Sequence, residues 1–337
     1  MLYYPKFIVK KLINSLQFRP FPFLSSPHLQ TILGSLCWAR IAPPSSQHFV
    51  LLDDGDQLCC EVSTPTLWKP DQKTIIMIHG LGGSHASTYM VRIARKLYGA
   101  GYRIVRANLR GCGSGKGLAQ LPYHGGLGHD ILKIIQALNR ETPESSIILL
   151  GFSLGGSIAL NLAAFWGKEC GDSLERIIAI CPSIDLAQSA NLLELYPLYE
   201  RYFLKHLIKY AKPWLKNPKI RTIREFDNAI TVPKWGFKDA DDYYKKCSIL
   251  SFLSEIKHPC DLIFAKDDPL IDYRAVLTAT VAPTTKLWLT SHGGHVGFLG
   301  NPAQNAPFFW LDQLLLEWVG KIVIQLEQSG AEFSHQS

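Results

Sequence analysis

The sequence predicts an α/β protein, with a mostly parallel eight-stranded sheet, helices on both faces and a helical lid insertion. Three observations predict this fold. Short β-type apolar runs alternate with helical patterns, as expected for parallel strands joined by crossover helices. This alternation stops between residues 183 and 258, where the composition becomes helical, aromatic and basic. A serine flanked by glycines joins one predicted strand directly to the next helix.

The composition is that of a globular protein with a large core. The 337 residues are 47% hydrophobic and 19% charged, enough for one large domain with an insertion or for two ordinary domains. No apolar run approaches the ~20 residues that span a bilayer. Residues 1–17 are apolar and basic without a signal-peptide core, so we expect them to pack as a helix or rest on a surface. The eight cysteines include no C-x-x-C pair, which is typical of a reducing cytoplasm.

The first half of the chain alternates strands and helices after an N-terminal arm. We assign residues 1–46 to this arm, which is proline-rich and aromatic from residue 18 onward. The expected strands are His48–Leu52, Leu58–Ser63, Lys73–His79, Arg103–Asn108, Ile147–Leu150 and Arg176–Cys181, and the expected helices are Met90–Ala100, Leu127–Arg140 and Ile158–Ala164.

A helix-rich insertion, residues 183–258, follows the sixth of these strands. Its prolines should break it into short helices. The remaining elements are the strands Asp261–Ala265 and Lys286–Thr290 and the helices Tyr273–Val281 and Pro307–Gln328, before a polar tail at residues 329–337. The core therefore comprises residues 47–182 and 259–328. The insertion should lie above the carboxyl ends of the strands, where it can act as a lid.

The strongest chemical signal is the Gly-x-Ser-x-Gly sequence at residues 151–155. It follows the apolar run Ile147–Leu150 and precedes a helix pattern rich in small residues. In a strand–turn–helix corner the serine is exposed in a strained conformation, and its flanks must be nearly free of side chains. The context predicts that Ser153 is a nucleophile.

A serine hydroxyl becomes nucleophilic when a histidine takes its proton and an acid orients that histidine. In this architecture the acid and the histidine should follow Ser153 in that order, on loops after later strands. We favour His295 over His292, because two glycines precede His295 and allow a close approach. We favour Asp268 over Asp267, because the acid usually stands just before a Pro-x-apolar sequence. The unused aspartate would be a surface or loop-fixing residue.

Acyl transfer also needs hydrogen-bond donors for the developing oxyanion. One candidate is the N–H of Leu154, at the start of the helix after the nucleophile. The second should come from the loop His79–Gly83, and we select the N–H of Leu81. His79 would fix this loop rather than titrate during catalysis, with a wholly structural role as the equal alternative.

The sequence gives little support for a nucleotide, metal or nucleic-acid site. The glycine-rich loop at residues 110–115 lacks the Gly-Lys-Ser/Thr ending of a phosphate-binding loop and the acidic residue of a dinucleotide site. The eleven histidines include no H-E-x-x-H pair, and no nucleic-acid recognition motif is present. We therefore predict no cofactor, metal or nucleic-acid partner.

Taken together, several motifs resemble the AB hydrolase 4 family, and most closely its bacterial YheT-like hydrolases. The similarity covers nearly the whole chain. It rests on residues 79–84, 110–113, 151–156, 267–269 and 293–298, and also on residues 27–31 and 224–227. The resemblance implies an α/β-hydrolase fold and hydrolysis of carboxylic esters, with lipid-acting acyltransferases and phospholipases among eukaryotic relatives. His28 and Asp227 belong to these motifs, and packing is the role we expect for them.

We therefore expect a carboxylic ester hydrolase that acts on a small-molecule ester, for example a lipid or medium-chain acyl ester, with Ser153, Asp268 and His295 as its triad. The alternatives are acyl transfer to an alcohol and a non-catalytic binding module. The segment from Glu200 to Arg224 carries eight cations against one acid. We expect these cations to face water on an amphipathic helix, and the alternative is a surface that meets anionic lipid or an acidic substrate.

Overall fold

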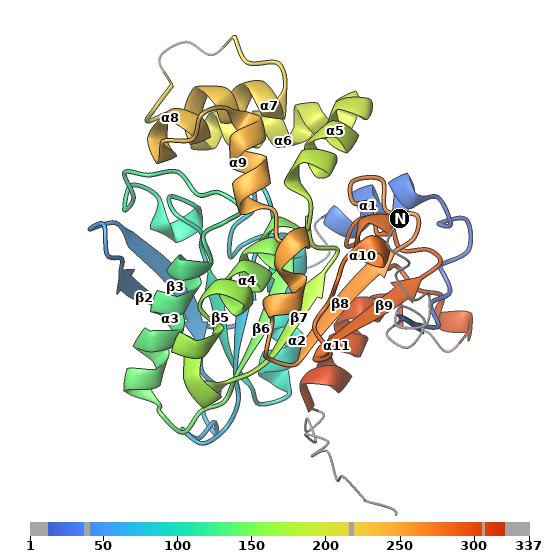
Figure 1. Ribbon diagram of the computed structural model, residues 1–337. Helices are drawn as coiled ribbons and strands as arrows, with labels where there is room; N and C mark the ends of the chain where they lie inside the picture. Colours follow the sequence, from blue (N-terminus) through green and yellow to red (C-terminus); the bar gives the residue numbers. More distant parts are fainter. Residues whose placement is uncertain (1–12, 37–40, 216–218, 305–306, 321–337) are drawn as a thin grey trace, which may run out of the picture.

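The computed structural model describes residues 13–36, 41–215, 219–304 and 307–320. Its centre is a twisted sheet with helices on both faces, and a group of short helices stands above one end (Figure 1). The strands, in chain order, are β1 Ile13–Ser15, β2 Ser46–Leu51, β3 Gln57–Ser63, β4 Thr74–Ile78, β5 Arg103–Ala107, β6 Ile147–Phe152, β7 Leu174–Ile180, β8 Cys260–Ala265 and β9 Thr285–Thr290.

The sheet has the order β1-β9-β8-β7-β6-β4-β5-β3-β2. Among the described strands, the pairs β2–β3 and β3–β5 are antiparallel, and all other neighbouring pairs are parallel. The predicted mostly parallel sheet is therefore confirmed. The predicted number of eight strands is wrong, because Ile13–Ser15 adds a ninth strand parallel to β9. This short edge strand depends on its pairing with β9, and the local sequence gives little sign of it.

The core consists of two apolar layers, one on each face of the sheet. Every residue of β4, β5, β6 and β8 is buried, as expected for parallel strands covered on both sides. Helices α3 (Gly128–Glu141) and α4 (Leu154–Phe165) pack on one face, which also continues into the lid. Helices α2 (Thr88–Gly99) and α11 (Trp310–Gly320) cover the other face.

The predicted insertion forms the group of helices that follows β7 (Figure 1). Its elements are α5 Leu186–Leu195, α6 Pro197–Tyr210, α7 Ile223–Phe226, the π-helical turn η4 Asp227–Thr231, α8 Val232–Trp235, α9 Ala240–Cys247 and the 3-10 helix η5 Leu250–Glu255. Pro197 occupies the first turn of α6, where its missing N–H removes no helical hydrogen bond. We refer to residues 183–258 as the lid.

One predicted helix is shorter in the structure, and one observed helix was not predicted. Helix α10 comprises only Arg274–Thr278, because the chain turns extended at Ala279 and the N–H of Ala282 bonds to Leu253 in the lid. The predicted N-terminal arm contains a regular helix, α1 Pro27–Ser35, which starts at a proline. The predictions for residues 1–12, for the end of the C-terminal helix and for the tail at 329–337 lie outside the described residues.

Candidate active site

Ser153 occupies a sharp corner between β6 and α4. Its backbone φ is 53° and ψ is −121°, a conformation that non-glycine residues rarely adopt. A Cβ atom on Gly151 would come within 2.6 Å of the backbone of Gly155 and Gly156, and a Cβ on Gly155 would collide with the carbonyl oxygen of Ile78. The two glycines that flank the serine are therefore required by the backbone on both sides of the corner.

The structure brings Ser153, His295 and Asp268 into one chain of hydrogen bonds. His295 Nε2 lies 2.9 Å from Ser153 Oγ, and its Nδ1 lies 2.8 Å from Asp268 Oδ2. The Asp268 side chain is fully buried, and that of His295 is 9% exposed. The other oxygen of Asp268 accepts the N–H groups of Leu270 and Ile271, at 2.8 and 3.1 Å. These bonds fix the carboxylate, and the carboxylate fixes the imidazole.

The alternative acid and histidine lie beside this chain rather than in it. Asp267 Oδ1 accepts the N–H of Gly294 at 3.0 Å, and its other oxygen lies 3.4 Å from His292 Nδ1. The His292 side chain is 45% exposed and, within the described residues, makes no hydrogen bond with Ser153. Asp267 thus ties the loop before His295 to the loop after β8.

The two residues that carry the predicted oxyanion donors line the same cavity as Ser153. The N–H of Leu154 begins α4, and the N–H of Leu81 belongs to the loop after β4. The neighbouring N–H groups of Gly80 and Gly82 already bond to the hydroxyls of Tyr89 and Tyr123, each at 2.9 Å. Among the described residues nothing accepts the N–H of Leu81 or of Leu154. Both groups are therefore free to bind an oxygen.

His79 holds the loop that carries Leu81. Its Nδ1 donates to the carbonyl oxygen of Gly80 at 2.8 Å, and its Nε2 accepts the N–H of Leu109 at 3.2 Å. The ring is fully buried, and burial lowers its pKa to about 4. His79 therefore stays neutral near pH 7 and bridges two loops at the carboxyl end of the sheet.

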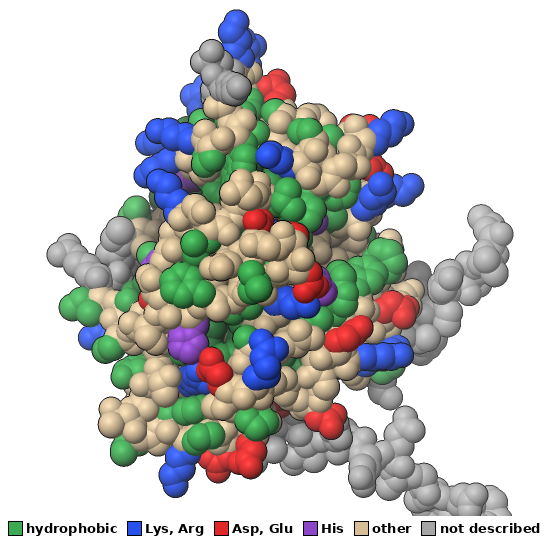
Figure 2. Space-filling model, turned by 90° about the vertical axis from the view of Figure 1, so that its left-hand side faces the viewer, with side chains coloured by type: hydrophobic (Ala, Val, Ile, Leu, Met, Phe, Trp, Pro, Cys, Tyr) green, Lys and Arg blue, Asp and Glu red, His purple; other side chains and the backbone are tan. Residues whose placement is uncertain are grey.

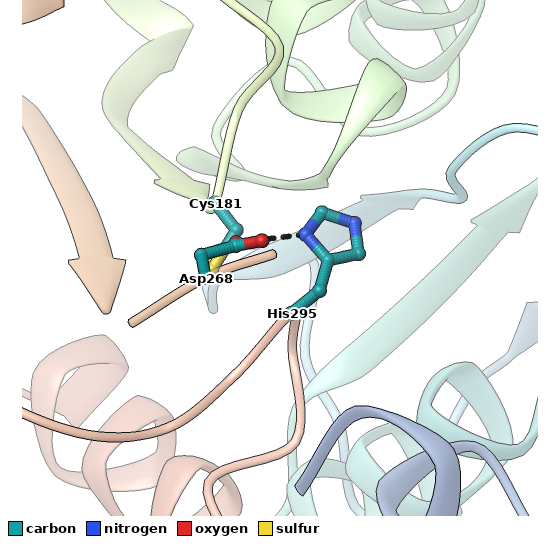
Figure 3. A group of neighbouring side chains, drawn as sticks. All are labelled: Cys181, Asp268 and His295. Atoms are coloured by element: carbon teal, nitrogen blue, oxygen red, sulfur yellow. Dashed lines mark hydrogen bonds and ion pairs between the residues drawn. The ribbon is translucent and has the colours of Figure 1, made fainter. Parts of the chain in front are cut away.

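A second residue with a positive φ, Cys181 at 45°, lies beside the acid and the histidine. Figure 3 shows its side chain at the end of β7, next to Asp268 and His295. One ligand atom from each of the three lies within 4.8 Å of the others, a spacing that could suit a metal ion. However, Asp268 already accepts three hydrogen bonds, and burial raises the pKa of the Cys181 thiol well above its usual value. Because both oxygens of Asp268 already accept hydrogen bonds, the three side chains fit a hydrogen-bonded acid and histidine better than a metal site.

Two hollows meet at Ser153 and His295. The first lies under the lid, has a free volume of about 80 Å³ and is lined mainly by apolar side chains. The second is an open groove of about 620 Å³ between α1 and α6. The linings of both include Leu81, Phe203 and Leu270. A bound molecule could therefore extend in two directions from the serine.

Comparison with known proteins agrees with this geometry. A family model described as the alpha/beta hydrolase fold matches residues 73–213. The chain is 30% identical to "Putative esterase YheT" of Escherichia coli over 91% of its own length and 94% of that protein. The chain belongs to the α/β-hydrolase family. The predicted resemblance and fold are thereby confirmed.

Other relatives of this α/β-hydrolase include a lipase and an esterase. The monoacylglycerol lipase of Saccharomyces cerevisiae is 31% identical over 69% of this chain and 57% of the lipase. Among solved structures, the esterase Pf2001 of Pyrococcus furiosus superposes with a TM-score of 0.55 at 19% identity, covering 83% of this chain and 97% of that one. This structural similarity shows the fold alone. The family match ends at residue 213, so Asp268, His295 and α1 all lie outside it.

Sequence reasoning missed two residues that contact the histidine loop. Thr31 and Gln30, both on α1, hydrogen-bond to the backbone of His295 and Leu299. A signal was available, because both belong to the Pro27–Thr31 motif that carried part of the family resemblance. The two motif residues without a derived role also have partners. His28 lies 3.0 Å from the Tyr199 hydroxyl, and Asp227 accepts the hydroxyls of Thr231 and Tyr244, each at 2.7 Å.

Two further findings concern the chain's surroundings. Within the described residues, no helix is both long and apolar enough to cross a bilayer. Seven of the eight cysteines lie in the described part of the chain, and all seven are buried free thiols; Cys37 lies outside it.

Proposed function

We propose that this protein is a serine hydrolase that cleaves carboxylic esters through an acyl-enzyme on Ser153. The main support is the hydrogen-bond chain from Ser153 through His295 to Asp268, with the serine held at a strained corner. The names of two relatives described above, "Putative esterase YheT" and a monoacylglycerol lipase, support the same chemistry.

In the acylation step, His295 Nε2 accepts the hydroxyl proton while Ser153 Oγ attacks the ester carbonyl carbon. Negative charge develops on the carbonyl oxygen, and the N–H groups of Leu81 and Leu154 stabilise it. His295 then donates its proton to the departing alkoxide, which leaves as an alcohol. Asp268 keeps the imidazole in the tautomer that carries hydrogen on Nδ1 and stabilises its positive charge.

Deacylation repeats these steps with water as the nucleophile. His295 takes a proton from water while the water oxygen attacks the acyl carbon. The bond from this carbon to Ser153 Oγ then breaks, His295 returns the proton to Oγ, and the carboxylic acid is released. Acyl transfer to an alcohol would use the same residues but requires the exclusion of water. Ser153 lines the groove between α1 and α6 and is partly exposed, which favours hydrolysis.

A fluorophosphonate probe tests the proposal, because it labels only an activated serine. We expect rapid labelling of the wild-type protein and none of Ser153→Ala. Equal labelling of the two proteins, or none of either, would falsify the assignment. The second result would favour a non-catalytic binding module on the same fold.

The two hollows suggest how an ester is placed. The small apolar cavity under the lid suits the shorter group of an ester, and the larger open groove suits the bulkier one. We expect a series of p-nitrophenyl esters from acetyl to palmitoyl to show a maximum in kcat/KM. A flat series would argue against binding of the acyl group in either hollow.

We also propose that the rim of the open groove meets an anionic lipid surface. Apolar side chains are exposed along both of its walls: Leu29 and Ile32 on α1 at 41% and 44%, and Leu198 and Tyr202 on α6 at 78% and 54%. Lys and Arg side chains are also numerous at the top of the molecule in Figure 2, which shows the side away from α1. Among the described residues, exposed Arg201, Lys205 and Lys209 of α6 have no ion-pair partner. Apolar residues next to free cations are the pattern of a surface that binds anionic membranes.

Vesicle co-sedimentation tests this surface. We expect stronger binding to vesicles containing phosphatidylserine than to phosphatidylcholine alone, and at least threefold weaker binding of Leu198→Asp. Leu67→Asp is the matched control, because Leu67 is 88% exposed but lies in the loop before β4, at the opposite end of the sheet. Equal binding to both vesicle types, or equal effects of the two substitutions, would rule the surface out.

A further inference from the structure

The loop that carries His295 is strained and has little regular structure of its own. It follows β9, and its backbone has positive φ at Gly293, Gly294, Val296 and Phe298. Two of these residues are not glycines, and such conformations persist only where the surroundings enforce them. The position of the imidazole therefore depends on whatever packs against this loop.

Helix α1 supplies that packing. We propose that Thr31 and Gln30 are positioning residues, which hold the His295 loop in the geometry that the proposed ester hydrolysis requires. This inference rests on the proposed function, since it assigns α1 a role in the same reaction.

Thr31 bonds directly to the residue that would act as the base. Its Oγ1 accepts the backbone N–H of His295 at 2.9 Å and donates its own proton to the carbonyl oxygen of Pro27 at 2.7 Å. Thr31 is only 9% exposed, at the wall of the groove between α1 and α6. Without the hydroxyl, the partly buried N–H of His295 would lose this partner, and the loop would shift to satisfy it.

Gln30 fixes the loop a few residues further on. Its side-chain oxygen accepts the N–H of Leu299 at 2.7 Å, and its side-chain nitrogen donates to the carbonyl oxygens of Leu299 and Leu24, at 3.1 and 2.7 Å. Gln30 is fully buried. An amide both donates and accepts, so a glutamate or methionine of similar length could not make this set of bonds.

The shape of the contact is as specific as its hydrogen bonds. A Cβ atom on Gly294 would collide with the carbonyl oxygen of Pro27, and one on Gly297 with that of Gln30. A Cβ on Gly34 would come within 2.6 Å of Gly297 Cα. The backbones of α1 and the loop are therefore in close contact at these three glycines.

The test compares Thr31→Val with Thr31→Ser. Valine keeps the shape of the side chain but removes the hydroxyl, and serine keeps the hydroxyl. We expect Thr31→Val to lower kcat for a p-nitrophenyl ester and the rate of fluorophosphonate labelling at least tenfold, with KM changed less than threefold. We expect Thr31→Ser to retain at least one third of both rates. A loss in kcat rather than KM indicates a misplaced base, because substrate binding does not depend on it.

Thr142→Val is the matched control for stability. The Thr142 hydroxyl also donates to the carbonyl four residues earlier, but it lies at the end of α3, away from the active site. If Thr31→Val lowers kcat no more than Thr142→Val does, or if Thr31→Ser is as slow as Thr31→Val, the inference is wrong. If Thr31→Val does not fold, Thr31→Cys provides the same comparison, because a thiol is a weak acceptor. Failure of the proposed function looks different, since the wild-type protein would then not be labelled at all.

Discussion

The two halves of the candidate active site are held in place in different ways. Ser153 stands at a corner whose shape follows from residues next to it in the chain, above all Gly151 and Gly155. His295 stands on a strained loop whose support comes from Thr31, 264 residues away in the sequence. The proposed nucleophile is thus held by a local feature of the fold, whereas the proposed base depends on contacts between residues far apart in the sequence.

This difference indicates which substitutions should disturb each half of the site. A change near Ser153 should damage the corner itself. A change in α1 leaves Ser153, His295 and Asp268 chemically intact but can move the imidazole, and a displacement of about 1 Å can lower a rate about 100-fold. Substitutions on the two sides should therefore differ in their effects on kcat and stability.

The largest effect is expected from the acid that orients the base. Asp268→Asn should lower kcat about 10³- to 10⁴-fold, because an amide cannot stabilise the charged imidazole and favours the wrong tautomer. Asp267→Asn should lower it no more than about tenfold, since the asparagine oxygen can still accept the N–H of Gly294. Steady-state kinetics on a p-nitrophenyl ester measures both. The reverse ranking would transfer the orienting role to Asp267.

A smaller loss of stability is expected from substitutions of the glycines at close backbone contacts. Gly155→Ala and Gly297→Ala each force a Cβ against a carbonyl oxygen, and each should cost about 2–4 kcal/mol in the free energy of unfolding. Gly297→Ala and Thr31→Val both loosen α1 from the histidine loop. Their effects on kcat should therefore be less than additive when combined.

Gly155→Ala provides the contrast, because it acts on the nucleophile side. Its effect on kcat should add to that of Thr31→Val within about 0.5 kcal/mol, as for independent sites. Double-mutant cycles on kcat, with urea unfolding in parallel, give both couplings. If the two pairs of substitutions couple equally, the two halves of the site are not supported independently.

The smallest effect concerns pH. Burial lowers the pKa of His79 to about 4 in the folded chain, against about 6.5 when unfolded. The unfolded chain therefore binds this proton first, and the free energy of unfolding should fall as the pH drops from about 6.5 to about 4. Between pH 7 and 5 the loss from His79 is about 2 kcal/mol. Thr31 and Gln30 do not titrate, so their contacts on the histidine side give no such loss.

Urea unfolding at pH 7 and 5 checks this dependence. His79→Asn should lose about 2 kcal/mol less than the wild-type protein over this interval. Asp227 should act with the opposite sign, because burial raises its pKa to about 6 and its protonation on acidification stabilises the folded chain. Asp227→Asn should therefore lose more stability than the wild-type protein. An unchanged pH dependence in both variants would contradict the assigned causes.

Features that follow from short-range sequence patterns were predictable from the amino-acid sequence. Alternating apolar runs predicted the mostly parallel sheet, and glycines on both sides of Ser153 predicted its corner, because steric limits act between near neighbours. Chain order and loop chemistry selected Asp268 and His295, the pair that the structure brings into hydrogen-bond contact with Ser153.

The positions of β1 and α1 depend on tertiary contacts. The edge strand β1 and helix α1 take their places through contacts with β9 and the histidine loop, which lie more than 250 residues further along the chain. Nothing in the local sequence around Gln30 or Thr31 specifies a partner at that distance. Their hydrogen bonds exist because packing buries them together, and burial makes an unpaired donor or acceptor costly.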